Sequence, residues 1–242
     1  MSNEHRTTNR FESLCRDEME LRRKGYRYIA GVDEAGRGPM AGPVVAAAVV
    51  LRPDAFIPLL DDSKKLAPRV REALFHEVLE QAVAVGIGIR SARFVDMKGI
   101  AEATYAAMRQ AVLALARRGH PPELVLVDGN RPVPALPFPQ QTRVRGDSAV
   151  ACIAAASIIA KVMRDRIMAS YQDLYPEYGF SKHKGYCTAD HRKNLERLGP
   201  CPIHRRSFSP VQLADDVLDE LHPLAVDEDG IEPPGCIHGE PF

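Results

Sequence analysis

The sequence predicts an α/β fold: a mixed β-sheet flanked by helices, with a small helical segment towards the C-terminal end. Short apolar runs come in close succession early in the chain, and later ones alternate with segments of helical periodicity. Turns containing glycine or proline separate these runs. The chain has 242 residues, of which 45% are hydrophobic and 26% charged. This size and composition suit one substantial soluble domain.

The first half of the chain contains three expected strands and one helix. Residues 28–32 are an apolar run that ends at Asp33 and Glu34, and residues 43–51 are a Val-rich run flanked by prolines. Their succession predicts one antiparallel hairpin within the sheet. A helix is expected over about 68–81, after the capping residues Asp61, Asp62 and Ser63. A third strand is expected over 82–89.

The second half predicts two further strands, each followed or preceded by a helix. A helix over about 101–118 ends at Gly119, and the apolar strand 124–127 stops at Asp128. After a proline-rich loop, residues 142–145 form an expected short strand. The long helix expected over 148–171 is rich in alanine, which suits close packing against a sheet.

The charge distribution divides the chain into three parts. Residues 1–27 form a polar N-terminal arm, residues 28–210 form the α/β domain, and residues 211–242 form a tail that we expect to be disordered. The tail contains nine acidic residues and no Lys or Arg, which leaves a charge of +9 on residues 1–210 because the whole chain is neutral. A basic body with an acidic tail is typical of a body that binds a polyanion.

The cysteines and the hydropathy indicate a cytoplasmic protein that does not span a membrane. Five cysteines are scattered along the chain, and the polar first 27 residues do not have the pattern of a secretory signal. We therefore expect reduced thiols. The longest apolar stretch, residues 149–160, is too short to cross a bilayer. No pattern indicates an oligomer, so a monomer is expected.

Three aspartates stand where α/β folds place their chemistry. Asp33 and Asp128 each end an apolar strand before a glycine turn, and Asp147 precedes the long helix. Singly, they can be a solvated strand end, a turn residue and a helix cap. Together they supply the oxygen ligands that Mg²⁺ prefers, and paired divalent ions catalyse displacement at phosphorus. Glu34 adjoins Asp33 on the opposite face of a strand. The four carboxylates therefore converge only if the strand bends, which Gly36 would permit.

These carboxylates lie in a series of motifs spread over most of residues 28–210. The motifs are Gly31–Pro39 (GVDEAGRGP), Asp62–Leu66 (DSKKL), Val127–Asn130 (VDGN), Gly146–Ser148 (GDS), Ala154–Val162 (AAASIIAKV), Arg164-Asp165, Tyr178–Phe180 (YGF), His183–Tyr186 (HKGY) and His204–Phe208 (HRRSF). Motifs of this number and order are specific, whereas a lone Asp-Glu pair is not. The series resembles the ribonuclease HII family.

The resemblance implies a ribonuclease H-like fold and an endonuclease dependent on Mg²⁺ or Mn²⁺. The implied reaction hydrolyses the phosphodiester 5′ of ribonucleotides in RNA–DNA hybrids and of single ribonucleotides embedded in duplex DNA. It leaves 3′-hydroxyl and 5′-phosphate ends. The four catalytic and metal-binding carboxylates of the family fall on Asp33, Glu34, Asp128 and Asp147. Where the family usually has Lys-Gly-Asp, this chain has Arg145-Gly146-Asp147, so the positive charge is kept.

The implied substrate contacts fall on a glycine turn and on a tyrosine. The family's glycine-arginine-glycine motif falls on Gly36, Arg37 and Gly38, whose backbone can approach a ribose 2′-hydroxyl closely. The tyrosine that helps to recognise the DNA–RNA junction falls on Tyr186. The alternative for Tyr186 is a ring that packs a loop onto the body.

Two basic segments are expected to contact phosphates. Ser63 and Lys64 stand at a predicted helix start, a natural phosphate site, although a capped and solvated helix end is the alternative. Residues 181–206 contain seven Lys or Arg against two acids, with Lys182 and Lys184 beside Tyr186. Such a patch binds a nucleic-acid backbone.

Three other readings remain beside this one. Cys187, His191, Cys201 and His204 have a spacing that could form a tetrahedral zinc site. The second alternative is a non-catalytic nucleic-acid binder of the same fold. The third is a structure-selective nuclease or integrase of the same superfamily. Four further acids are interpreted as structural, with Asp165 paired to a neighbouring arginine: Asp61, Asp62, Asp96 and Asp165.

Overall fold

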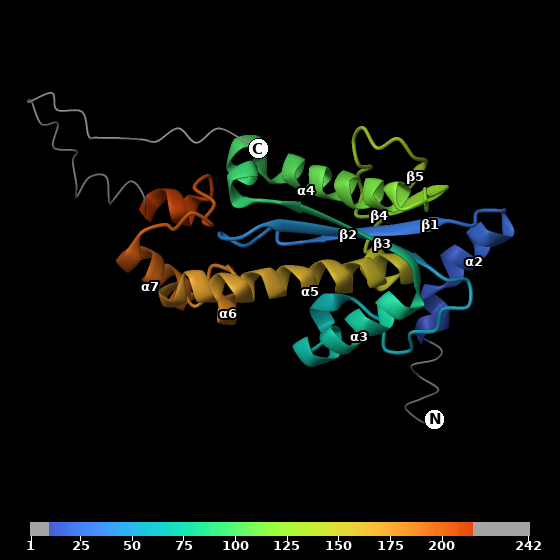
Figure 1. Ribbon diagram of the computed structural model, residues 1–242, viewed down its shortest axis with the longest axis horizontal. Helices are drawn as coiled ribbons and strands as arrows, with labels where there is room; N and C mark the ends of the chain where they lie inside the picture. Colours follow the sequence, from blue (N-terminus) through green and yellow to red (C-terminus); the bar gives the residue numbers. More distant parts are fainter. Residues whose placement is uncertain (1–9, 215–242) are drawn as a thin grey trace, which may run out of the picture.

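A five-stranded mixed sheet forms the centre of the molecule, in a computed structural model that describes residues 10–214 (Figure 1). The expected disorder of the acidic tail falls almost entirely outside these residues. The strand order is β3-β2-β1-β4-β5. β1 pairs antiparallel with β2, and β2 with β3, whereas β1–β4 and β4–β5 are parallel. The strands are β1 (Ile29–Ala35), β2 (Val44–Leu51), β3 (Ala82–Arg90), β4 (Leu124–Asp128) and β5 (Gln140–Arg143).

Helices cover both faces of this sheet. Figure 1 shows α4 over one face, and α5 with α3 over the other. The expected C-terminal helical segment is formed by α6 and α7. The helices are α2 (Arg16–Arg23), α3 (Pro68–Gln81), α4 (Ala92–Arg117), α5 (Ala151–Leu174), α6 (Phe180–His183) and α7 (Ala189–Leu198), and the 3₁₀ turns are η1 (Ser63–Lys65), η2 (Gly146–Ser148) and η3 (Pro176–Tyr178).

Each face of the sheet has its own apolar core, and β1 contributes to both. Ile29 packs in the core beneath α5, whereas Ala30 and Val32 pack in the core beneath α4. The helix α5 approaches β1 so closely that a Cβ atom on Gly31 would lie 2.2 Å from the backbone carbonyl carbon of Cys152. Small residues on both elements permit this contact, as the alanine-rich sequence of α5 predicted. Because side chains alternate between the two faces along β1, that of Asp33, which follows Val32, points towards α5.

Four details of the fold differ from the prediction. Two antiparallel pairings replace the single expected hairpin. The helix α4 begins at Ala92, with an interruption at Gly99, where φ is 78°. β5 lies two residues earlier than expected. The expected start of the long helix is a separate 3₁₀ turn, because Arg145 is left-handed (φ 56°) and α5 begins only at Ala151.

The N-terminal arm is folded onto the domain within the described residues. Its helix α2 follows a helical segment over residues 10–14, the first that the structure describes. The side chains of Phe11, Leu14 and Leu21 are buried in the core beneath α5. Among the residues described, none of the helices is both long and apolar enough for a membrane span.

Candidate active site

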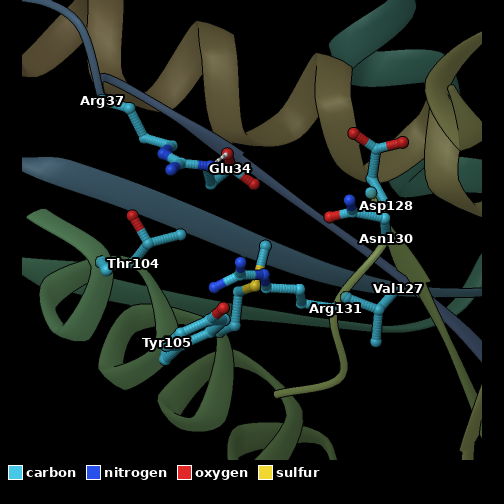
Figure 2. A pocket seen from close by; sticks show the side chains of 11 residues that line it. Glu34, Arg37, Thr104, Tyr105, Val127, Asp128, Asn130 and Arg131 are labelled. Atoms are coloured by element: carbon cyan, nitrogen blue, oxygen red, sulfur yellow. Dashed lines mark hydrogen bonds and ion pairs between the residues drawn. The ribbon is translucent and has the colours of Figure 1, made fainter. Parts of the chain in front are cut away.

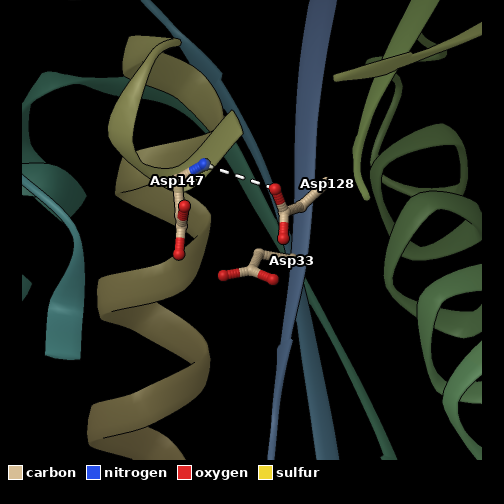
Figure 3. Close-up of side chains that lie close together, drawn as sticks. All are labelled: Asp33, Asp128 and Asp147. Carbon is tan, nitrogen blue, oxygen red and sulfur yellow. Dashed lines mark hydrogen bonds between the residues drawn. The ribbon is translucent and has the colours of Figure 1, made fainter. Parts of the chain in front are cut away.

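Three aspartates from three separate segments meet at one edge of the sheet (Figure 3). Asp33 lies near the end of β1, Asp128 ends β4, and Asp147 lies in η2 just before α5. One carboxylate oxygen of each lies within 4.8 Å of the others. β1 and β4 are parallel neighbours in which Val32 pairs with Val127, so their carboxyl ends coincide. The predicted meeting of Asp33, Asp128 and Asp147 is therefore present.

Hydrogen bonds fix the turn of Asp147 against Asp128. The Oδ1 atom of Asp128 accepts hydrogen bonds from the backbone N–H of Gly146 at 2.7 Å and of Asp147 at 3.4 Å. In β1, the Oδ1 atom of Asp33 accepts from the backbone N–H of Glu34 at 2.7 Å. Backbone donors therefore hold the carboxylates of Asp33 and Asp128.

The cluster concentrates negative charge in a poorly hydrated place. Burial, followed by the charges of Glu34 and Asp128, raises the pKa of Asp33 well above its usual range. Burial and the charge of Asp147 also raise the pKa of Asp128. Both shifts indicate that the ionised cluster is disfavoured unless a cation shares it. Three oxygen donors at this spacing are the ligand type that a hard divalent ion takes.

Lys64 supplies part of the compensating charge. Its Nζ atom donates to Oδ2 of Asp147 at 2.9 Å, although its side chain is 75% exposed. Burial alone would lower the pKa of Lys64, but this hydrogen bond and the charge of Asp147 raise it. Lys64 was predicted to contact a phosphate, and the structure places it at the rim of the carboxylate cluster.

Glu34 does not join the other three carboxylates, because the expected bend of β1 is absent. β1 stays paired with β2 through Ala35, with Glu34 opposite Ala46. Glu34 therefore faces the α4 side of the sheet, where its Oε1 atom lies 3.4 Å from Nη1 of Arg37. It lines a pocket with Asp128 and Arg131, so Asp128 borders both the cluster and this pocket (Figure 2).

Ser63 was predicted to contact a phosphate at the surface, but it lies inside the protein. Its side chain is buried, and its Oγ atom lies 2.8 Å from Oγ of Ser157. A side-chain hydrogen bond with Ser157 in turn opposes the rise in the pKa of Asp33. Ser63 therefore supports Asp33 from within the protein. The expected cap of this turn is Asp62, which accepts from the N–H of Lys64 at 2.9 Å.

A buried arginine, which the sequence analysis missed, holds the glycine turn. Arg205 has no exposed surface, and its guanidinium donates to the carbonyl oxygens of Gly36, Arg37 and Gly42 at 2.5, 3.0 and 2.9 Å. Gly36 has a φ of 96°, a conformation that favours glycine. The motif HRRSF was the available signal, but a sequence does not show that an arginine points inward.

A second buried arginine joins the segment that follows the glycine turn to the loop of Tyr186. Arg164 in α5 donates to the carbonyl oxygens of Ala41 and Pro43, each at 3.0 Å, and of Lys184 at 2.9 Å. A Cβ atom on Gly36 would lie 2.2 Å from Nε of Arg164. The glycine turn and the tyrosine loop, far apart in sequence, are therefore attached to one another through α5.

Tyr186 lies at the surface above this arginine. Its side chain is 44% exposed, and its ring centre is 5.7 Å from Nζ of Lys161 and 5.9 Å from Cζ of Arg164. Lys182 is exposed and Lys184 half-buried, and both line a surface pocket with Tyr186. The loop thus presents an aromatic ring among basic side chains, a combination that proteins use to bind single-stranded nucleic acid.

The alternative zinc site is not formed in the part of the chain that the structure describes. Cys187 is exposed, while Nε2 of His191 lies 3.0 Å from Nε2 of His204, and Sγ of Cys201 lies 3.1 Å from Nδ1 of His204. These ring nitrogens are engaged with one another. Over residues 10–214, the group of side chains that could hold a metal ion is the aspartate cluster.

The acids interpreted as structural have structural partners. Asp165 binds Lys161 at 2.6 Å and lies 3.7 Å from Arg71, which confirms its pairing with an arginine and adds a lysine. Asp61 forms an ion pair with Arg10 at 2.8 Å. Asp96 accepts from the backbone N–H of Ser207 at 2.9 Å and from its hydroxyl at 2.6 Å.

Comparison with known proteins gives one consistent result. The family model described as Ribonuclease HII matches residues 30–211. A ribonuclease HII of Syntrophotalea carbinolica is 54% identical over 195 residues, which are 81% of this chain and 91% of the relative. One of Geobacillus kaustophilus is 54% identical over 208 residues, 86% of this chain and 78% of the relative.

Solved structures agree with the observed fold. The ribonuclease H2 of Pyrococcus horikoshii OT3 matches with a TM-score of 0.66 and 25% identity, over 80% of this chain and 100% of the other. A Bst ribonuclease HIII in complex with Mn²⁺ matches with a TM-score of 0.65 and 16% identity, over 81% of this chain and 71% of the other. The ribonuclease H-like fold is confirmed. With a family model over most of its length and relatives more than half identical, the chain belongs to the ribonuclease HII family and is an endoribonuclease of the ribonuclease H type.

Proposed function

We propose that this ribonuclease hydrolyses the phosphodiester 5′ of ribonucleotides, both in RNA–DNA hybrids and at single ribonucleotides embedded in duplex DNA. The products would carry 3′-hydroxyl and 5′-phosphate ends, as the resemblance implies. The observation that carries the proposal is the meeting of Asp33, Asp128 and Asp147, with oxygens within 4.8 Å of one another. The glycine turn and Tyr186, joined through Arg164, supply a means to recognise the ribonucleotide.

The aspartate cluster fits Mg²⁺ or Mn²⁺. Its donors are carboxylate oxygens, and the raised pKa values of Asp33 and Asp128 indicate a site that a cation would stabilise. Asp33, Asp128 and Asp147 would bind the ion, with Glu34 available from the adjoining pocket. Divalent ions would activate the attacking water and stabilise the leaving oxygen. The Mn²⁺ complex of the ribonuclease HIII with this fold is consistent with the proposal.

The chain's own residues would select and orient the substrate. Arg205 fixes the carbonyls of the glycine turn, so the turn cannot adapt freely to a sugar without a 2′-hydroxyl. A rigid polar site discriminates strongly, because the analogue that lacks the hydroxyl leaves polar groups unpaired. Tyr186 would stack on the sugar or base at the junction, and Lys182 and Lys184 would bind the backbone phosphates.

One cleavage assay tests the proposal. The substrates are a DNA duplex with a single embedded ribonucleotide, a continuous RNA–DNA hybrid and an all-DNA duplex, each with Mg²⁺, with Mn²⁺ and with EDTA. We expect cutting of the first two substrates 5′ of a ribonucleotide, no cutting of the third, and no reaction in EDTA. Equal cleavage of the all-DNA duplex would contradict ribonucleotide recognition, and cleavage in EDTA would contradict the metal site.

Salt dependence tests the phosphate contacts of the tyrosine loop. Each phosphate contact contributes about 0.9 to the slope of log affinity against log salt. The double variant Lys182→Gln/Lys184→Gln should therefore reduce that slope by about 1 to 2. Lys24→Gln/Lys98→Gln removes two exposed lysines elsewhere and is the matched control. An unchanged slope in the first variant would show that these lysines do not contact the backbone.

A further inference from the structure

Residues 10–24 of the N-terminal arm contact the segment that carries Asp147 at three separate points. This arm precedes the residues matched by the family model, which begin at residue 30. We propose that the arm is a positioning element that holds Asp147 in place for divalent-metal binding. The inference depends on the proposed metal-dependent function and assigns a role to a part of the chain that the family motifs do not include.

The first contact is a buried carboxylate at the start of α5. Glu18 is 5% exposed, and its Oε1 atom accepts from the backbone N–H of Cys152 at 2.7 Å. Cys152 lies in the first turn of α5, where backbone N–H groups have no partner within the helix. Val150, the residue before the helix, provides no side-chain cap. Glu18 therefore fixes the helix start that follows Asp147.

Two further contacts hold the segment before α5 from the outside. Arg10 donates through Nη2 to the backbone carbonyl of Ser148 at 2.8 Å, and also binds Asp61 at 2.8 Å. Asp17 accepts from Nε of Arg143 at 2.6 Å. The three contacts therefore fall at residues 143, 148 and 152, on both sides of Asp147.

The segment needs support because its own structure is weak. It contains a three-residue 3₁₀ turn, a left-handed Arg145, and exposed side chains at Val144 and Ala149. The carboxylate of Asp147 also faces the like charge of Asp128. Asp128 and Lys64 hold this turn from the side of the site, and the arm adds contacts on both sides of Asp147.

The arm is itself well anchored. Phe11, Leu14 and Leu21 are buried in the same apolar core as Val150 and the first residues of α5. Burial of the Glu18 carboxylate is unfavourable and raises its pKa. Glu18 is therefore a buried acceptor on a well-anchored arm, and it acts on Asp147 through the start of α5.

Mn²⁺ titration of the full chain by calorimetry, without nucleic acid, tests the proposal. Glu18→Ala should weaken Mn²⁺ binding roughly tenfold, the lower end of what loss of a group supporting a metal ligand costs. Glu18→Gln keeps an oxygen acceptor and should bind Mn²⁺ nearly as the parent does. Glu20→Ala is the matched control, because Glu20 lies on the same helix with its side chain 65% exposed and pairs with Lys24.

A second variant keeps the test valid if Glu18→Ala does not fold. Arg10→Gln/Asp17→Asn removes both outer contacts and leaves the buried anchors intact, and it should weaken Mn²⁺ binding several-fold. Unchanged Mn²⁺ affinity in the arm variants, measured well below their Tm, would overturn the positioning role even if the Tm falls. A parent protein that binds no Mn²⁺ would overturn the proposed metal site and this inference together.

Discussion

Two regions of this molecule bury charge in opposite ways. The carboxylate cluster (Asp33, Asp128 and Asp147) brings like charges within 4.8 Å of one another. The arginine bridge (Arg164 and Arg205) buries two guanidinium groups, but each donates to several backbone carbonyl oxygens. The cluster is electrostatically unfavourable as it stands, whereas the bridge has its hydrogen bonds satisfied.

This difference separates a site prepared for a ligand from a structural connection. Burial raises the pKa of Asp33, so the ionised cluster gains from a bound cation. Burial lowers the pKa of Arg164 to about 10 and of Arg205 to about 9, so both guanidinium groups stay charged near neutral pH. Substitution in the cluster should therefore reduce catalysis, and substitution in the bridge should reduce stability.

The largest expected effect is the loss of stability when Arg205 is replaced. Arg205→Met leaves the carbonyls of Gly36, Arg37 and Gly42 without their buried donor. We expect the free energy of unfolding to fall by about 4 kcal/mol, from several unsatisfied groups at 1–3 kcal/mol each. Urea unfolding measures this, with Arg192→Met, at an exposed arginine of α7, as the control. Parental stability in Arg205→Met would contradict the structural role of the bridge.

The cluster should show the reverse behaviour. Asp128→Asn removes one charge and should reduce the cleavage rate roughly 10²-fold or more, the scale of losing a central electrostatic element. Its free energy of unfolding should be unchanged or higher, because the repulsion by Asp147 is relieved. Single-turnover cleavage and urea unfolding of the same preparation measure both effects.

Asp165→Asn is the matched control for this prediction. Asp165 is an acid within α5, and it is paired with Lys161 and Arg71. Its substitution should leave the rate close to parental and lower the stability by about 1 kcal/mol. Equal losses of rate in Asp128→Asn and Asp165→Asn would remove the distinction between the cluster and the structural acids.

A third prediction concerns the histidines beneath the tyrosine loop, which are buried and neutral. The backbone N–H of Cys201 donates to Nδ1 of His204, and His191 and His204 share a hydrogen bond between their Nε2 atoms. Nδ1 of His191 then donates to the carbonyl of Tyr186 at 2.9 Å. Burial lowers the pKa of His191 to about 4 and of His204 to about 3, with the charge of His183 acting in the same direction on both.

Stability should therefore decrease in mild acid. The unfolded chain binds protons at these histidines below about pH 6.5, whereas the folded protein does not until about pH 4. The unfolding free energy should fall by about 1.4 kcal/mol per histidine for each pH unit below 6.5. Urea unfolding between pH 7.5 and pH 5 measures the slope, and His191→Asn/His204→Gln should flatten it. An equal slope in that variant would contradict the assignment of the acid sensitivity to His191 and His204.

The sequence was sufficient to predict the cluster but not the bridge. Asp33 and Asp128 end apolar runs, so their position follows from local pattern and from parallel pairing. The direction of Glu34 depends on whether β1 bends, which its pairing with β2 decides. The buried contacts of Arg205 are to backbone carbonyls, which every residue has. The motif HRRSF contains Arg205, but nothing in the sequence shows which backbone carbonyls that arginine binds.

Long-range packing also decided the position of Ser63 and of the N-terminal arm. Ser63 is a polar residue at a helix start, where exposure is usual, but Ser157 of α5 covers it. Residues 1–27 look polar in sequence, yet Phe11, Leu14 and Leu21 are enough to attach the arm. In both cases the outcome depends on a surface that forms only when α5 packs on the sheet.

The smallest expected effect is on substrate choice, and it concerns Tyr186, the exposed residue beside Arg164 of the bridge. The loop of Tyr186 is held by its backbone: Arg164 binds the carbonyl of Lys184, and His191 binds the carbonyl of Tyr186. The ring is 44% exposed, so its removal should leave the Tm close to parental. Tyr186→Ala should reduce cleavage of a single embedded ribonucleotide about tenfold more than cleavage of a continuous hybrid, in the range of one lost base–aromatic stacking contact.

Tyr186→Phe separates the ring from its hydroxyl. If stacking alone positions the junction, this variant should keep most of the parental activity on both substrates. If the hydroxyl contacts the substrate, the variant should resemble Tyr186→Ala on the single ribonucleotide only. Tyr175→Phe is the control, because the ring of Tyr175 packs edge-on against Phe180 of α6. This variant should not distinguish the two substrates. A parallel decline on both substrates with a lower Tm would make Tyr186 a packing residue, and recognition would then depend on the glycine turn that Arg205 holds.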